Sequence, residues 1–285
     1  MAQGSTQPAA GTALITGASS GIGYEFALLF ARGGYDVVLV GRNRSALNAL
    51  AARIRDEIER AAEVFAKDLS VHTAPDELFC ELQRKGVEVD ALVNDAGFAM
   101  QGAFVENDVA TLLDMLQVNI VTVTHLTRLF LPGMIARGRG KILNMSSIGA
   151  FMPGPLMAAY FASKSYVLSL SEALSNELQG TGVSVTALCP GPTRSKFALR
   201  ARLTDTKAFR GTLMDPAGVA QQGFDAMMKG KAVAIAGFKH RMQLLPTPLV
   251  PRRLLAYFAR QYHEIPSSNG HWESADAPHP SHAAP

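Results

Sequence analysis

Tyr160 and Lys164 lie four positions apart in Tyr160-Phe161-Ala162-Ser163-Lys164, a segment whose pattern predicts the first turns of a helix. At this spacing two side chains share one face of a helix and can act in one site. A free phenol has a pKa of about 10, too high for a good base near neutral pH, and a nearby ammonium lowers that pKa by stabilising the phenolate. The pair could exchange a proton with a carbonyl or a hydroxyl group. A Tyr-x-x-x-Lys spacing alone also arises by chance on helix surfaces.

A glycine-rich turn follows the first apolar run of the chain and leads directly into a helical pattern. Glycine permits a tight turn and a close approach of the backbone to a pyrophosphate, and the helix start offers free N–H donors to that anion. The turn predicts a dinucleotide site after Thr16, with contacts from Gly17, Ser19, Ser20, Gly21, Ile22 and Gly23.

The segment Gly17–Gly21 also fits the G-x-S-x-G pattern of a hydrolase nucleophile elbow. In that fold several strands precede the nucleophile, and an acid and a histidine follow it. Here the pattern closes the first predicted strand, and His72, His125 and His240 have no supporting context. The dinucleotide interpretation is favoured.

The end of the second predicted strand indicates which dinucleotide binds. NAD-binding folds place an acid there to bond the ribose 2′-hydroxyl, whereas this chain has Gly41-Arg42-Asn43-Arg44. The guanidinium of Arg42 can pair with a 2′-phosphate, so NADP(H) is favoured over NAD(H). The alternative is that Arg42 and Arg44 are solvated loop charges.

Short apolar runs alternate with helical patterns along the chain, which is typical of an α/β fold with a parallel sheet. We expect a single doubly wound, Rossmann-type parallel sheet with helices on both faces. Strands are predicted at 13–16, 37–40, 64–66, 91–93, 142–145, 183–188 and 232–235, and helices at 22–31, 45–60, 75–85, 108–136, 158–179 and from Asp215-Pro216.

The expected domain organisation is simple. Residues 1–10 form a flexible N-terminus, 11–264 form one catalytic domain, and 265–285, rich in Pro, Ser, His and Ala, form a disordered tail. Within the domain, about 192–214 has no clear period and is predicted to be a substrate loop or short helices over a cleft.

Composition excludes several classes of protein. A net charge of +3 with dispersed basic residues argues against a nucleic-acid partner. Met1–Gly11 has no basic region followed by an apolar run, so we expect a cytoplasmic protein. Cys80 and Cys189 are interpreted as buried structural thiols, and no metal site is expected.

A basic, apolar segment near the C-terminus, Pro251–Arg260, is predicted to be an amphipathic helix. Packing on its own domain or on a partner subunit is favoured, and contact with a membrane surface is not expected.

Taken together, these motifs resemble those of the classical short-chain dehydrogenase/reductase family, and the resemblance covers about Thr12 to Thr193. The glycine turn matches the family's cofactor loop, and the family's four catalytic residues correspond to Asn119, Ser147, Tyr160 and Lys164. Further cofactor contacts that the resemblance implies are Asp68, Leu69, Asn94, Ala96, Gly97, Tyr160, Lys164, Pro190, Gly191 and Thr193. Asp95 is a departure, because many relatives have asparagine there.

The resemblance implies a reaction in which Ser147 and Tyr160 polarise a carbonyl, Tyr160 donates the proton, and Lys164 holds the cofactor ribose and lowers the tyrosine pKa. Asn119 would position a water that resupplies the proton. It also implies a homodimer or homotetramer. Alternatives are a non-catalytic NADP(H)-sensing or scaffold protein, or an epimerase or dehydratase of the same fold. An apolar carbonyl or alcohol substrate is expected from the cleft wall, which we predict to include Phe98, Met100, Phe151, Met152, Pro153, Leu156 and Met157.

Overall fold

A computed structural model describes residues 9–201, 203, 204 and 206–264, which form an α/β domain built on one sheet. All of the strand pairs are parallel, and the spatial order is β3-β2-β1-β4-β5-β6-β7. The strands are β1 (Thr12–Thr16), β2 (Asp36–Gly41), β3 (Ala62–Ala66), β4 (Ala91–Asn94), β5 (Gly140–Met145), β6 (Val183–Cys189) and β7 (Val233–Ile235). The expected doubly wound sheet is confirmed.

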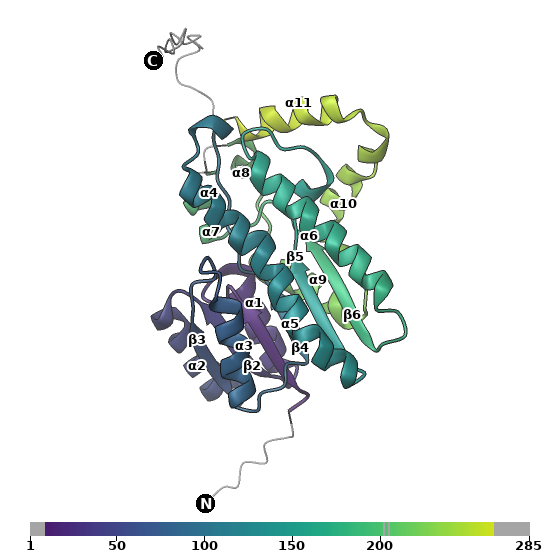
Figure 1. Ribbon diagram of the computed structural model, residues 1–285. Helices are drawn as coiled ribbons and strands as arrows, with labels where there is room; N and C mark the ends of the chain where they lie inside the picture. Colours follow the sequence, from purple (N-terminus) through teal and green to yellow (C-terminus); the bar gives the residue numbers. More distant parts are fainter. Residues whose placement is uncertain (1–8, 202, 205, 265–285) are drawn as a thin grey trace, which may run out of the picture.

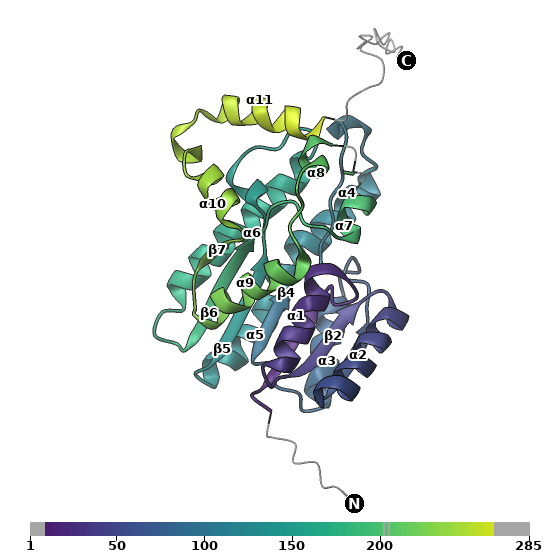
Figure 2. The ribbon, with the colours of Figure 1, turned by 180° about the vertical axis from the view of Figure 1, so that it is seen from behind.

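Helices cover both faces of this sheet, as Figures 1 and 2 show from opposite sides. The α-helices are α1 (Gly21–Arg32), α2 (Arg44–Ile58), α3 (Ala74–Arg84), α4 (Val109–Leu116), α5 (Val123–Ala136), α6 (Ala158–Glu177), α7 (Lys196–Arg200), α8 (Lys207–Arg210), α9 (Pro216–Met228), α10 (Phe238–Leu244) and α11 (Arg252–His263). Short 3₁₀ turns are η1 (Phe104–Glu106), η3 (Ile148–Phe151) and η4 (Thr247–Leu249), and η2 (Gln117–Thr122) is a π-helix.

Two apolar cores sandwich the sheet. On one face, α1, α2 and α9 bury Phe26, Ile54 and Val219, and on the other, α3 and α5 bury Leu78 and Leu126. Strands buried on both faces explain the nearly continuous apolar runs of the sequence.

The sequence predicted one helix over 108–136, but the structure divides it into α4, the π-helix η2 and α5. By length and composition alone, Val109–Ala136 could cross a membrane. In the fold, however, α5 packs against α3 and contacts β4 and β5. It is a covering helix of the sheet.

Other sequence expectations have mixed outcomes. The helix start at Asp215-Pro216 is confirmed, since Asp215 Oδ2 accepts from Gly218 N at 3.3 Å. Cys189 is buried, but Cys80 is exposed on α3, so the interpretation of Cys80 as a buried thiol was wrong.

The expected flexible ends fall mainly outside the described residues. Residues 1–8 and 265–285 are not described, and Ala10, assigned to the N-terminal segment, donates to Gly34 O at 2.9 Å. The expected substrate loop at about 192–214 contains α7 and α8.

Candidate active site

A cavity of about 670 Å³ opens at the carboxyl ends of the strands. It begins at β1 and β4, where the strand order reverses, which is where doubly wound sheets bind their ligands. Its lining includes most of the predicted cofactor residues, namely Gly17, Ser19, Ser20, Gly21, Ile22, Arg42, Asp68, Leu69, Ala96, Gly97, Pro190, Gly191 and Thr193, together with Ser147, Tyr160 and Lys164.

The glycine turn depends on backbone that other residues would strain. Gly17 and Gly21 have φ values of +72° and +66°, which L side chains adopt at a cost. A Cβ on Gly23 would lie 2.6 Å from Asp95 Oδ2 and 2.7 Å from Gly17 O. Gly23 was predicted to contact the cofactor, but it does not line the cavity. Its lack of a side chain lets α1 pack closely against the turn.

The first turn of α1 suits an anion. Ser20 occupies the N-cap without a side-chain capping bond, and the turn contains no acidic residue. N–H groups at such a helix start are donors for phosphate. The site thus fits the pyrophosphate of a dinucleotide.

Arg42 and Asp68 line the cavity just after the carboxyl ends of β2 and β3. Arg42 Nη1 lies 3.9 Å from Asp68 Oδ2. The Arg42 side chain is 61% exposed, so its guanidinium can turn toward a ligand phosphate.

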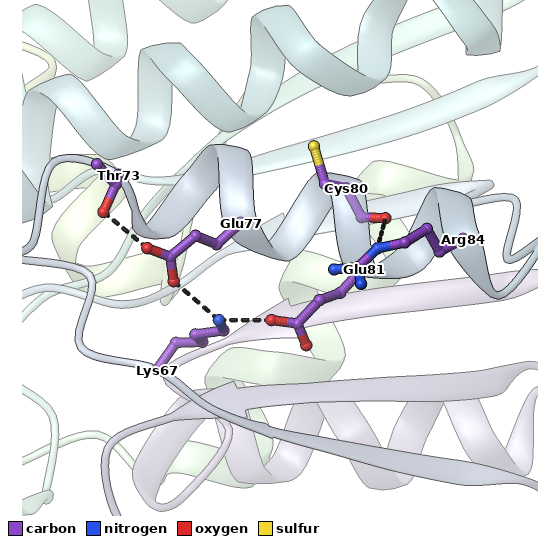
Figure 3. Close-up of polar contacts among 6 residues, drawn as sticks. All are labelled: Lys67, Thr73, Glu77, Cys80, Glu81 and Arg84. Atoms are coloured by element: carbon purple, nitrogen blue, oxygen red, sulfur yellow. Dashed lines mark hydrogen bonds and ion pairs between the residues drawn. The ribbon is translucent and has the colours of Figure 1, made fainter.

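Lys67 lies beside Asp68 but is already engaged, as Figure 3 shows. Its ammonium donates to Glu81 Oε1 at 2.6 Å and Glu77 Oε2 at 3.0 Å, and Thr73 Oγ1 donates to Glu77 at 2.8 Å. These hydrogen bonds raise the pKa of Lys67. The two carboxylates balance the charge of Lys67, so Arg42 is the less engaged of the two cations beside Asp68.

Thr16, at the end of β1, holds the loop after β4 in place. Its Oγ1 accepts hydrogen bonds from the N–H groups of Asp95 and Ala96, both at 3.0 Å. Asn94, a predicted cofactor contact, is buried instead. Its Nδ2 donates to Asn144 Oδ1 at 2.9 Å and Thr127 Oγ1 at 3.3 Å. Asn94 therefore holds β4 to its neighbours and does not line the cavity.

Asn119 lies in the π-helix η2 and is fully buried. Its Oδ1 accepts from Phe98 N at 3.2 Å, and its Nδ2 donates to Phe98 O at 3.0 Å and Ser163 Oγ at 3.1 Å. A Cβ on Gly97 would lie 2.9 Å from Asn119 Oδ1 and 3.5 Å from Lys164 Nζ. The sequence-predicted Asn119 is thus behind the cavity wall, next to Lys164.

Ser147 and Tyr160 form the polar wall of the cavity. Ser147 Oγ caps η3, accepting from Gly149 N at 3.0 Å, and it hydrogen-bonds the Tyr160 hydroxyl, which lowers the pKa of Tyr160. Burial has the larger effect and raises that pKa to about 12.

Lys164 was expected to lower the tyrosine pKa, but the structure does not show this. Its Nζ donates to Met145 O at 2.8 Å and lies 5.7 Å from the Tyr160 ring centre. Burial lowers the pKa of Lys164 to about 8, against the opposing charge of Asp95. Burial likewise raises the pKa of Asp95 to about 7, while the charge of Lys164 and a hydrogen bond from Gly23 N lower it.

The cavity roof is a feature that sequence reasoning missed. Leu255, Phe258, Ala259, Tyr262 and His263 of α11 line the cavity, and the His263 ring packs edge-on against Phe161, with centres 5.1 Å apart. Of the predicted apolar wall, Phe98, Met152 and Met157 line the cavity, whereas Met100, Phe151, Pro153 and Leu156 are not among its lining residues.

The substrate side is completed by the segment after β6. Thr193 pairs with Met214 in a parallel bridge, and Thr193 Oγ1 donates to Gly191 O at 2.9 Å. Phe197, Leu203 and Phe209 close the apolar part of the cavity. The predicted loop therefore contributes to the substrate side.

Comparisons with known proteins agree with this geometry. The family model for short chain dehydrogenase matches residues 11–206. A very-long-chain 3-oxoacyl-CoA reductase of Pyrenophora tritici-repentis is 37% identical over 177 residues, which are 61% of this chain and 52% of that protein. This chain spans about half the length of that relative.

Two solved structures are similar over most of the chain. A short-chain dehydrogenase from Sphingobium yanoikuyae in complex with NADPH has a TM-score of 0.76 and 32% identity, covering 84% of this chain and 93% of its own. A short chain dehydrogenase/reductase from Burkholderia phymatum in complex with NAD has a TM-score of 0.75 and 25% identity, covering 83% and 92%.

Proposed function

This chain belongs to the short-chain dehydrogenase family and is an oxidoreductase of that type, and we propose that it interconverts a carbonyl compound and an alcohol with NADP(H). The observation that carries the proposal is the placement of Ser147, Tyr160 and Lys164 on one cavity with the glycine turn and the free first turn of α1.

NADP(H) would supply or accept the hydride when bound. The first turn of α1 would bind its pyrophosphate, Arg42 its 2′-phosphate, and Lys164 its ribose. The exposed guanidinium of Arg42 and the engagement of Lys67 by two carboxylates support NADP(H) over NAD(H).

The protein groups move the proton. In reduction, the Ser147 and Tyr160 hydroxyls donate hydrogen bonds to the substrate oxygen, which stabilises the negative charge that develops there. Tyr160, whose pKa is about 12, keeps its proton at neutral pH and gives it to that oxygen as a general acid. Asn119 would hold a water that returns a proton through Lys164.

The substrate that fits the cavity is an apolar ketone, aldehyde or β-ketoacyl compound. Phe98, Met157 and Phe197 line the region beside Tyr160. The name of the Pyrenophora relative supports a β-ketoacyl group as one member of this class.

The proposed assembly follows from the family resemblance. Val109, Leu113 and Val121 are exposed along α4 and η2, and Tyr166 is exposed on α6. These side chains are the surface through which we propose that the protein forms a homodimer or homotetramer. Its proposed location is cytoplasmic.

The test is a panel of ketones, aldehydes and β-ketoacyl thioesters, with NADPH and NADH in parallel and oxidation of the cofactor followed by absorbance. We expect net NADPH consumption with bulky apolar carbonyls. No turnover of any substrate despite NADPH binding would favour a sensor or scaffold, whereas conversion of substrate without net NADPH consumption would indicate an epimerase or dehydratase.

A further inference from the structure

Helix α11 has one face on the cavity and another that nothing in the described chain covers. Ala259 is buried and Leu255 half-buried on the inner face. On the outer face Leu254 is 49% exposed and Tyr257 58% exposed. Packing on its own domain, as the sequence suggested, therefore accounts for only part of this helix.

Further exposed apolar side chains lie in the segments next to α11. Leu249, in η4 just before α11, is 88% exposed, and Leu245 is also exposed. Phe104 and Val105 of η1 are exposed as well. The loop before η1 reaches the end of α11, because Gln101 Nε2 donates to His263 O at 3.1 Å. Figures 1 and 2 both show α11 across the same end of the molecule as α4.

We call the set of Phe104, Val105, Leu245, Leu249, Leu254 and Tyr257 the α11 patch. Exposed apolar side chains gathered at one end of a protein mark an interaction surface. The patch borders the cavity, because Phe258 and Tyr262 of the same helix are exposed and also line it.

The charge of the segment 237–264 is mainly positive, whereas Glu106 and Asp108 lie next to Phe104 and Val105. Lys239, Arg241, Arg252, Arg253 and Arg260 lie between 237 and 264, where Glu264 is the one acidic residue. Glu264 Oε1 lies 3.7 Å from Arg260 Nε, so it balances one of these charges. Arg252 and Arg253 are exposed at the start of α11.

We propose that the α11 patch docks on the surface of an anionic phospholipid bilayer, with Leu254 and Tyr257 inserted at the level of the headgroups and Arg252 and Arg253 bound to lipid phosphates. A helix with arginines beside aromatic and aliphatic side chains has the composition of an interfacial helix. Anionic lipids attract such basic residues, and salt screens that attraction.

The chemistry of the patch favours a bilayer over a protein. A second copy related by two-fold symmetry would place Arg252 and Arg253 of both chains in one interface, where like charges repel. A protein partner would need grooves that match protruding side chains such as Leu249, whereas a fluid lipid surface accepts them without a fixed shape. On the bilayer the part of the cavity wall formed by Phe258 and Tyr262 lies beside the lipid.

The test is flotation of the full chain with vesicles of equal parts phosphatidylcholine and phosphatidylserine, compared with phosphatidylcholine alone. We expect the chain to float with the mixed vesicles, and raised salt to release it. Arg252→Gln/Arg253→Gln should bind the mixed vesicles about tenfold more weakly or worse. Leu254→Gln/Tyr257→Gln should also lose binding.

Matched controls are Arg55→Gln/Arg84→Gln, which removes the same charge from α2 and α3, and Met228→Gln, which replaces an exposed apolar side chain of α9. Both should float like the parent chain. The proposal is overturned if the parent chain fails to float at low salt, or if the controls lose binding as much as the patch variants. It is also overturned if the patch variants only reduce the size of the assembly in size-exclusion chromatography, which would assign the patch to a second copy.

Discussion

The charges of Asp95 and Lys164 each counteract the pKa shift that burial causes in the other side chain. Burial pushes both side chains toward their neutral forms, and the charge of each partner pulls the other toward its ionised form. The resulting pKa values, about 7 for Asp95 and about 8 for Lys164, fall where enzymes operate. The asparagine that many relatives carry in place of Asp95 would have no charge to exert.

The first prediction concerns this pair. In Asp95→Asn the charge that raises the pKa of Lys164 is gone, so that pKa should fall further below its ordinary value. Lys164 then loses its proton at lower pH, and the decline of reductive kcat/KM on the alkaline side should shift to lower pH. The measurement is a kcat/KM profile with NADPH from about pH 6 to pH 10. Asp225→Asn on α9 is the control, and an unshifted Asp95→Asn profile would contradict the coupling.

The second prediction concerns the proton donor. Tyr160→Phe keeps the ring among its neighbours but has no proton to give, so kcat should fall by about 100-fold to 10,000-fold. NADPH affinity, measured by fluorescence titration, should stay within about twofold, because the removed hydroxyl acts on substrate. Tyr166→Phe removes a hydroxyl from the same helix and should keep full activity. Near-normal turnover of Tyr160→Phe would show the mechanism to be wrong.

The third prediction concerns cofactor choice. Arg42→Gln should raise the KM for NADPH by about tenfold or more, because a guanidinium–phosphate pair is lost. The KM for NADH should hardly change. Arg55→Gln on α2 loses the same charge at a distance from the groove and serves as the control. Equal loss with both cofactors would instead assign Arg42 a structural role.

The fourth prediction concerns packing at the glycine turn. Gly23→Ala would force a Cβ against Gly17 O and Asp95 Oδ2, which should cost about 1–3 kcal/mol of stability and weaken NADPH binding. Gly218→Ala in α9 meets no heavy atom within 4 Å and should be neutral or stabilising by up to about 1 kcal/mol. Urea unfolding of both variants, with and without NADPH, makes the comparison. A Gly23→Ala variant as stable as Gly218→Ala would refute the packing argument.

The sequence alone predicted the site residues whose spacing along the chain is local. The glycine turn, Tyr160 and Lys164 depend on spacing within one strand-turn-helix or one helix, and the structure places them on one cavity. The cavity roof was missed because His263 meets Phe161 across about a hundred residues of chain, with no periodic signal that links the two. Asn94 was assigned to the cofactor because the segment Asn94-Asp95-Ala96-Gly97 resembles the family's pattern, but its own side chain bonds Asn144 within the sheet.

The electrostatics were less predictable than the positions. An ammonium four residues from a phenol suggested a lowered tyrosine pKa, but the direction of the shift depends on how deeply both groups are enclosed. For Tyr160 that enclosure comes partly from the segment after β6, whose Phe197 ring lies 5.6 Å from the Tyr160 ring between centres, and for Lys164 it includes the end of β5 at Met145. Asp95, which the sequence marked only as a departure, is the charge that acts on Lys164.

The π-helix at Gln117–Thr122 makes the long helix after the β4 loop sensitive to deletion. An α-helix turns about 100° per residue, and a π turn contains one residue more than an α turn. Loss of a single residue in η2 would therefore change the π turn into an α turn, which keeps α4 and α5 on nearly the same faces but removes the widened turn that carries Asn119. Asn119 would then lose its hydrogen bonds to Phe98 and Ser163. In this segment the number of residues, and not their identity alone, is therefore under functional constraint.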